Sequence, residues 1–177
     1  HELVNENSLS FSKTEKTKNI NPINIKDTVP DYSNTETTNQ KLTIYIDNSV
    51  SYDSFHDSKF IDCEVNDGES YLFVVRKQFT FDDVEFSFTN TKVGAIKIEC
   101  SEKIIIRNCK FTSCEVSNSL GNCIYISPNS QTTSSDSDFL YEFTDLTFTQ
   151  NQKDGYAVYL DNCYNSILMQ NSVFSFN

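Results

Sequence analysis

The sequence has little of what helical, membrane-spanning or nucleic-acid-binding proteins require. Its 177 residues include only two Ala, one Met and no Trp, whereas β-branched and aromatic residues number 64. This balance favours strands over helices. The longest fully apolar run covers five residues, 71–75, far fewer than the ~20 that a spanning helix needs. The net charge of −11 disfavours binding to nucleic acid, because both molecules are anionic.

Metal-binding patterns are equally scarce. The chain has two His, His1 and His56, and no pair of Cys separated by two residues. Zinc sites in proteins are built mostly from such groups. We therefore expect neither a metal centre nor a cofactor.

A strand-like repeat begins near residue 41. Its template is apolar-x-apolar-x-(Asn/Asp)-x-x-Phe, in which apolar residues alternate as they do along a half-buried strand. Clear copies begin at Phe79, Ile104, Tyr141 and Ile167, and a weaker copy begins at Phe55. The Phe anchors are Phe60, Phe86, Phe111, Phe148 and Phe174. The Asn/Asp positions are Asp57, Asp83, Asn108, Asp145 and Asn171.

A second short strand lies between consecutive anchors, as at 95–98, 123–126 and 157–160. One such unit cannot bury its apolar face alone, but stacked units form a continuous interior. The sequence therefore predicts an all-β, right-handed parallel β-helix of about five coils over residues 41–177. Its handedness follows the crossover rule for parallel strands. Residues 1–40 are predicted to be a flexible or capping segment. An antiparallel sandwich is the competing fold, but its strands need not repeat one template in register.

The Asn/Asp positions are interpreted as structural. Each is expected to occupy the same turn of its coil, where Asn and Asp tolerate unusual backbone angles. Neighbouring coils lie ~4.8 Å apart, so the side chains are expected to hydrogen-bond to one another along the stack.

Motifs in residues 55–177 resemble the repeats of polymorphic outer membrane proteins, which occur in chlamydial surface autotransporters and in similar trichomonad surface proteins. That family is marked by F-x-x-N and G-G-A-(I/L/V) motifs. Phe148-Thr-Gln-Asn151 and Phe174-Ser-Phe-Asn177 match the first motif, and Val93-Gly94-Ala95-Ile96 is a degenerate form of the second. Phe60-x-x-Cys63 and Phe111-x-x-Cys114 place Cys where the family has Asn. The resemblance implies a surface-exposed or secreted β-helix with adhesive or antigenic roles and no catalytic residues.

Two features are candidates for partner contact. Outward positions of the second strand align Tyr45, Lys97, Tyr125 and Tyr159, and Tyr combines an apolar body with a polar tip. The longest gap between Phe anchors contains a polar insertion, 127–138, with Asp136 and Asp138. Insertions in solenoids project from one face, which is often the binding face. The expected partner is a host-surface protein or a glycan. Packing between neighbouring strands, which stabilises the sheet, would also explain the row of tyrosines.

The six cysteines (Cys63, Cys100, Cys109, Cys114, Cys123 and Cys163) have two interpretations. They are small buried apolar residues, or some form a bond within one coil, such as Cys114 to Cys123. Cys63 and Cys114 themselves lie two coils apart, which is too far for a disulfide.

The sequence thus favours a non-enzymatic, extracellular or cell-surface module for adhesion. The first alternative is a pectate-lyase-like, carbohydrate-active enzyme, for which Asp82-Asp83 is the candidate acid pair. The second is a structural stalk, which further coils of the same larger protein would extend.

Overall fold

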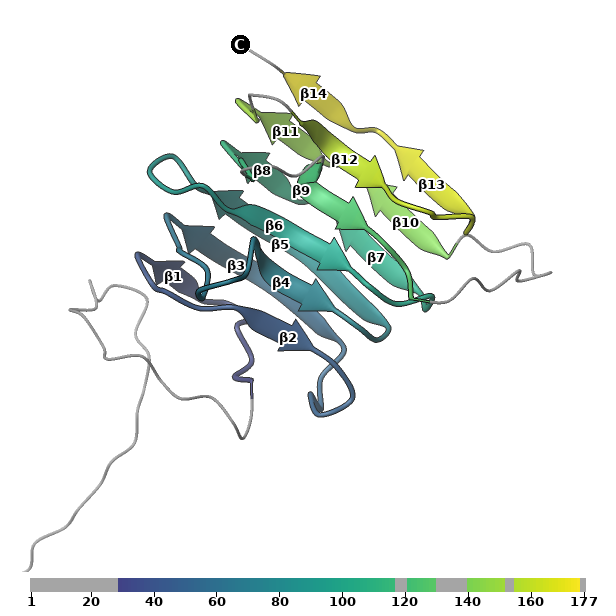
Figure 1. The fold of residues 1–177 in the computed structure, drawn as a ribbon, viewed down its shortest axis with the longest axis horizontal. Helices are drawn as coiled ribbons and strands as arrows, with labels where there is room; N and C mark the ends of the chain where they lie inside the picture. Colours follow the sequence, from purple (N-terminus) through teal and green to yellow (C-terminus); the bar gives the residue numbers. More distant parts are fainter. Residues whose placement is uncertain (1–28, 117–120, 130–139, 152–154, 176–177) are drawn as a thin grey trace, which may run out of the picture.

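The structure, a computed structural model, describes residues 29–116, 121–129, 140–151 and 155–175, all folded as strands and turns without a helix (Figure 1). Nine strands form one sheet: β1 (Glu36–Thr38), β3 (Ser54–Ile61), β5 (Phe79–Ser87), β7 (Ile104–Arg107), β8 (Lys110–Thr112), β10 (Tyr141–Thr144), β11 (Thr147–Thr149), β13 (Ile167–Gln170) and β14 (Val173–Ser175). Five form the other: β2 (Ile44–Ile46), β4 (Tyr71–Val75), β6 (Gly94–Ile98), β9 (Gly121–Ile126) and β12 (Tyr156–Leu160).

The two sheets are the walls of a parallel β-solenoid of about five coils, as the repeat predicts. The paired strands in both sheets run parallel, and the order of the five-stranded sheet, β12-β9-β6-β4-β2, follows the chain coil by coil. In the nine-stranded sheet, long strands such as β5 pair with two shorter strands of the next coil, β7 and β8. Figure 1 shows the coils stacked in chain order, with the C-terminus at one end of the stack.

The Phe anchors form one continuous row through the nine-stranded sheet. Register pairs each anchor with the next: Phe60 with Phe86, Phe86 with Phe111, Phe111 with Phe148, and Phe148 with Phe174. The rings stack with centroids 4.7–5.8 Å apart and planes within 15° of parallel. The first four side chains are fully buried. This row is the spine of the hydrophobic core, because burial and offset stacking of each ring both contribute to stability.

The Asn/Asp positions all lie at one corner of the coil in the left-handed backbone conformation. Their φ values lie between 50° and 56° for Asp57, Asp83, Asn108, Asp145 and Asn171. Asn and Asp are enriched several-fold in this region because their short polar side chains tolerate it. The residue type at this corner therefore follows from the backbone turn.

The expected side-chain ladder along this corner is wrong for the described coils. The five side chains are exposed, and no hydrogen bond joins one of them to another in the part of the chain that the structure describes. The Asn108 amide instead donates to the Asp82 carboxylate over 2.9 Å. Three of the five residues are aspartates, whose like charges disfavour direct contact.

The solenoid also begins earlier than residue 41. Strand β1 pairs with β3, so residues 36–38 already belong to the nine-stranded sheet. The Tyr32 ring packs against Phe55 and Phe60, with centroids 5.8 and 5.5 Å apart. Residues 29–40 therefore cover the N-terminal end of the core, while residues 1–28 lie outside the described part of the chain.

Candidate functional site

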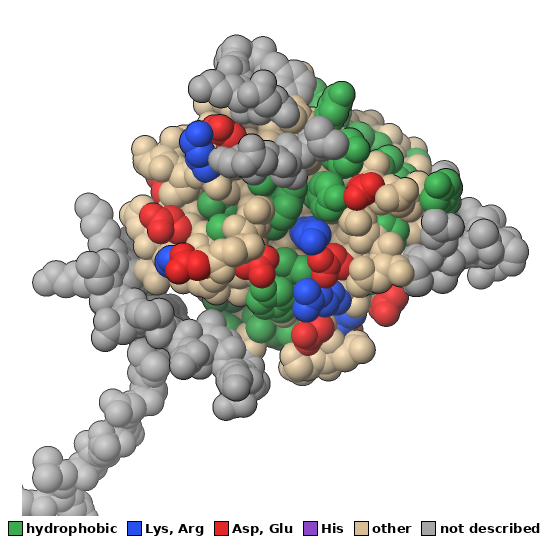
Figure 2. All heavy atoms as spheres, viewed as in Figure 1, with side chains coloured by type: hydrophobic (Ala, Val, Ile, Leu, Met, Phe, Trp, Pro, Cys, Tyr) green, Lys and Arg blue, Asp and Glu red, His purple; other side chains and the backbone are tan. Residues whose placement is uncertain are grey.

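The predicted outward residues of the five-stranded sheet stand in one row. Register pairs Tyr45 with Val74, Val74 with Lys97, Lys97 with Tyr125, and Tyr125 with Tyr159. We call Tyr45, Lys97, Tyr125 and Tyr159 the tyrosine strip. Val74 fills the one coil for which the sequence offered no candidate, and it is almost completely covered. Figure 2 shows this side of the molecule, where basic and acidic side chains lie next to one another among hydrophobic patches.

At its N-terminal half, the tyrosine strip is held by a charged network. The Tyr45 hydroxyl donates to the Glu69 carboxylate, and the Arg76 guanidinium lies 5.0 Å from the centroid of the Tyr45 ring. Such a cation over a ring face is attracted by the negative face of the ring. Burial first, and the Glu69 carboxylate next, raise the pKa of Tyr45 to about 12. The Tyr45 hydroxyl therefore stays protonated at neutral pH.

Glu99 joins this network to Lys97. Its carboxylate accepts from Arg76 Nε over 2.8 Å and pairs with Lys97 Nζ over 2.6 Å. Burial acts to raise the pKa of Glu99, but hydrogen bonds from Lys97 and Arg76 outweigh it and leave the pKa below its ordinary value. Glu99 is thus an ionised bridge between two cations. It fixes the position of Lys97 within the tyrosine strip.

At its C-terminal half, the tyrosine strip is aromatic. Lys97 Nζ lies 6.0 Å from the centroid of Tyr125, and the Tyr125 hydroxyl donates to Asp161 Oδ2 over 2.6 Å. The Tyr125 and Tyr159 rings stack with centroids 5.8 Å apart, and Tyr156 stacks on Tyr159 at 6.0 Å. Ring faces therefore point along the solenoid axis, towards each other. A partner would meet ring edges and hydroxyl groups on a surface whose rotamers are already fixed.

Tyr71 braces this aromatic half from the neighbouring rows. Its hydroxyl donates to the Gly121 carbonyl over 2.5 Å, and its ring centroid lies 5.9 Å from that of Tyr125. The ring crosses Gly94 so closely that a Cβ there would lie 2.4 Å from Tyr71 Cδ1. The path of the Tyr71 ring therefore explains why a glycine, Gly94, begins β6. Sequence reasoning missed Tyr71, because the bracing crosses two coils.

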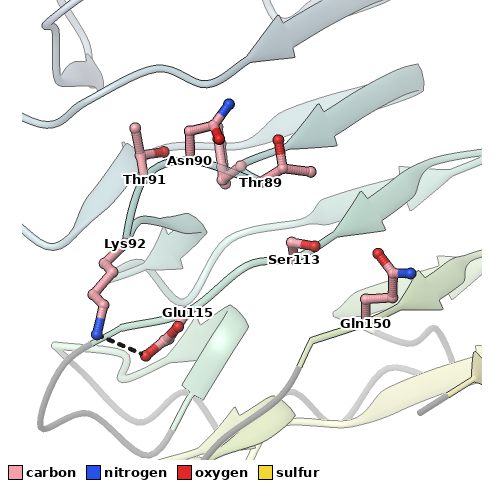
Figure 3. Close-up of a pocket in the computed structure, with 8 residues that line it drawn as sticks. Thr89, Asn90, Thr91, Lys92, Ser113, Glu115 and Gln150 are labelled. Atoms are coloured by element: carbon pink, nitrogen blue, oxygen red, sulfur yellow. Dashed lines mark ion pairs between the residues drawn. The ribbon is translucent and has the colours of Figure 1, made fainter. Parts of the chain in front are cut away.

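A separate polar pocket of about 310 Å³ lies where three coils turn (Figure 3). Asn90, Lys92, Ser113, Glu115 and Gln150 are among its lining residues, and Lys92 Nζ pairs with Glu115 Oε1 over 3.2 Å. The loop that carries Asn90 is anchored from the preceding coil. The Asn90 backbone N–H donates to Asp62 Oδ1 over 3.0 Å, and the Asn90 side-chain amide donates to Asp62 Oδ2 over 2.8 Å. Hydroxyl and amide groups beside this one ion pair suit a small polar ligand.

The candidate acid pair of the enzyme alternative is not arranged as a general acid. Asp82 Oδ2 accepts from Arg107 Nη2 over 2.8 Å, and Asp82 Oδ1 accepts from the Asn108 amide. The Arg107 hydrogen bond lowers the pKa of Asp82, whereas a general acid needs a raised pKa. Asp83 is an exposed corner residue. Asp82 is therefore best explained as the partner of Arg107 in an ion pair, and Asp83 as the residue of the adjacent turn.

This ion pair predicts an acid-sensitive contribution to stability. The folded pKa of Asp82 lies below the ordinary value of 3.8. Its contribution is therefore complete above that value and disappears as the pH falls through the folded pKa. Urea denaturation at pH 5 and pH 3 should show a smaller loss of unfolding free energy for D82N than for the unchanged protein. Equal losses would contradict a stabilising Asp82–Arg107 pair.

The cysteines are free thiols in the structure, and Cys63, Cys100, Cys109, Cys114 and Cys123 are buried. Burial raises the pKa of Cys63 and Cys100 to about 11 and that of Cys109 to about 12. Burial first, and the neighbouring Cys114 thiol next, raise the pKa of Cys123 well above its ordinary value. Such thiols are poor nucleophiles, because the thiolate is the reactive form.

No group of three or more His, Cys, Asp or Glu side chains suited to a metal ion occurs within the described ranges. Asp136 and Asp138, the candidates from the insertion, lie outside the described residues.

The described part of the chain contains no helix long and apolar enough to cross a membrane. In comparisons with known proteins, no family model, curated protein or solved structure matches this chain. The functional interpretation therefore stands on the geometry of the chain itself.

Proposed function

We propose that the chain is a non-enzymatic binding module of a secreted or cell-surface protein, and that it contacts a partner protein through the tyrosine strip. The observation that carries the proposal is the connected surface from Tyr45 to Tyr159, in which rings and ion pairs hold each other in place. A surface ordered before binding loses little side-chain entropy when a partner docks. Tyr is also among the residues that most often dominate binding energy at interfaces.

A protein partner fits this surface better than a sugar stacked on a ring. The faces of Tyr125 and Tyr159 are turned towards each other, so neither presents both faces to solvent. What remains outward is hydroxyl groups, ring edges and the Lys97 ammonium group, which match the mixed polar and apolar character of protein interfaces. The acidic net charge of −11 also disfavours unspecific attraction to anionic cell surfaces.

The double variant Y125A/Y159A is expected to weaken binding to cultured epithelial cells at least ~10-fold, because a truncated interface Tyr costs about 2 kcal/mol or more at a hot spot. Fluorescently labelled chain would be titrated on the cells and read by flow cytometry. The matched control is K110A/T147A, which removes two outward side chains paired in the nine-stranded sheet.

The control should bind as the unchanged chain does, and denaturation curves should show that both variants are folded. Equal binding by Y125A/Y159A and the unchanged chain would contradict the assignment of the tyrosine strip. Absence of binding by the unchanged chain would contradict adhesion to these cells and favour a structural stalk.

A further inference from the structure

The polar pocket lies where one coil departs from a regular corner of the solenoid. In four coils this corner is a residue with a φ value between 47° and 54°: Asn39, Asp62, Ser113 and Gln150. In the coil of β5 and β6 the corner position is taken by Phe88, whose side chain is buried. The chain then continues through the loop 89–92 before β6 begins. This loop and the corners of the next two coils enclose the polar pocket.

The loop 89–92 is anchored from both neighbouring coils. Thr89 Oγ1 and both N–H donors of Asn90 bond to the Asp62 carboxylate, and the Glu115 N–H donates to the Val93 carbonyl over 3.2 Å. Burial acts to raise the pKa of Asp62, but the hydrogen bonds from Asn90 and Thr89 outweigh it and leave the pKa below its ordinary value. The loop is therefore held by an ionised carboxylate. A wall that is ordered before binding lowers the entropy cost of taking up a ligand.

The charges that line the polar pocket cancel. Lys92 and Glu115 are the two charged residues among its lining, and they form an ion pair at one side of it (Figure 3). Their side chains are 66% and 29% exposed, so a ligand can reach both. The ionised Asp62 next to the loop disfavours a phosphate or carboxylate ligand, and Lys92 disfavours a cation. The ligand that fits this field carries no net charge.

The neutral groups of the lining have unused hydrogen-bonding capacity. Within the described ranges, no hydrogen bond joins Ser113 Oγ or the Gln150 side-chain amide to another residue. The Asn90 amide nitrogen is bonded to Asp62, which leaves Asn90 Oδ1 as an acceptor. The polar pocket thus presents donors and acceptors side by side. A sugar hydroxyl matches such a lining, because it donates one hydrogen bond and accepts others.

We propose that the polar pocket binds one ring of a neutral sugar, as a free sugar or as the end of a glycan. Its volume of about 310 Å³ lies at the lower limit of the range for small-molecule sites, which suits a single ring. Adjacent hydroxyl groups of one ring can accept from Lys92 and donate to Glu115 at the same time. The assignment does not depend on the tyrosine strip, which lies on the outer side of the five-stranded sheet.

Titration of the isotope-labelled chain, followed through its amide NMR signals, tests this assignment. The probes are glucose, galactose, mannose and N-acetylglucosamine, with inorganic phosphate and glycine as charged controls. At least one sugar should cause saturable shifts at residues 89–92, Ser113, Glu115 and Gln150, and neither control should. The methyl glycoside of that sugar separates the two sources. Equal binding by the glycoside indicates the end of a glycan, and its loss indicates a free sugar.

The double variant Ser113→Gly/Gln150→Asn tests the contacts without straining the corner. Gly and Asn both accept the φ of 54° at these positions. One change removes the hydroxyl and the other draws the amide back, so the dissociation constant of the sugar should rise at least ~10-fold. Asn39→Gly is the matched control, because it changes the equivalent corner of the first coil, away from the polar pocket. It should leave the affinity unchanged.

Three results would overturn the proposal. The first is the absence of saturable shifts with all four sugars. The second is binding of phosphate or glycine in place of a sugar, which would contradict the neutral ligand class. The third is a sugar affinity that the double variant leaves unchanged.

Discussion

Replacing Phe111 with Ala is expected to lower the free energy of unfolding by about 3–5 kcal/mol, the range for a buried Phe truncated in a packed core. The Phe111 side chain is fully buried. Its ring stacks between Phe86 and Phe148, with centroids 5.1 and 5.0 Å away. The truncation therefore removes apolar burial and two ring contacts, and it leaves a cavity between coils that cannot close without shifting both sheets. Equilibrium denaturation in urea measures the loss.

Phe174→Ala is the matched control, since it removes the same side chain from the same row. Phe174 stacks on Phe148 at 4.7 Å but is 44% exposed, because it lies in the last coil. Its loss should be clearly smaller than that of Phe111→Ala. Equal losses for the two variants would mean that the Phe row is not the spine of the core.

Asn151→Ala is expected to destabilise the chain by about 2–6 kcal/mol, because two buried backbone groups lose their partners at about 1–3 kcal/mol each. The Asn151 side chain is buried. Its Oδ1 accepts from the Cys114 N–H over 2.8 Å, and its Nδ2 donates to the Phe111 carbonyl over 2.9 Å. One side chain thus bridges two backbone groups of the preceding coil. Denaturation midpoints and slopes provide the measurement.

Asn151→Cys is the informative companion variant. Cys63 occupies the equivalent position in an earlier coil, three residues after the anchor Phe60. Its Sγ donates to the Thr37 carbonyl over 3.5 Å. A Cys therefore keeps a weak form of one of the two bridging hydrogen bonds. Asn151→Cys should fall between Asn151→Ala and the unchanged chain. If Asn151→Ala and Asn151→Cys were equally destabilising, the hydrogen bond to the backbone carbonyl of the preceding coil would not explain why Asn or Cys occupies this position.

This bridge gives a physical reason for the F-x-x-N pattern in this chain. Phe148 continues the aromatic row, and Asn151 ties the next turn to the coil before it. In Phe60-x-x-Cys63, the Cys63 thiol makes a weaker hydrogen bond of the same kind to the backbone of the preceding coil. The proposed relation to polymorphic outer membrane proteins stays a resemblance of motifs, while the local role of these residues follows from their contacts.

The repeat could be predicted from the sequence wherever the same structural position in each coil requires the same type of residue. The left-handed corner selects Asn or Asp, and the row inside the sheet selects Phe, so both recur visibly at Asn108 and Phe111. A second left-handed corner escaped notice because its residues differ in type: Asn39, Asp62, Ser113 and Gln150. The packing of Tyr32 against Phe55 fits the capping alternative for the N-terminal segment, but the pairing of residues 36–38 with β3 could not be predicted, because residues 29–40 do not repeat the template.

The tyrosine strip could be predicted as a row, but its contacts could not. The strand period places Tyr45, Lys97 and Tyr125 on one side of the sheet. Glu99 and Arg76 lie in a neighbouring row, and their ion pair depends on side-chain rotamers that the sequence pattern does not encode. The predicted hydrogen-bonded corner ladder does not form, because three of its five residues are aspartates, whose like charges disfavour direct contact. Its positions were correct, but the Asn108 amide donates to the adjacent row.

Radical footprinting of the chain bound to epithelial cells tests most directly whether the tyrosine strip is the contact surface. Free and cell-bound chain would be exposed to hydroxyl radicals, and oxidation of each Tyr would be quantified by mass spectrometry. Binding is expected to protect Tyr125 and Tyr159, while Tyr164, which is 73% exposed and outside the tyrosine strip, is oxidised equally in both states. Unchanged oxidation of Tyr125 and Tyr159 in the bound chain would contradict the account.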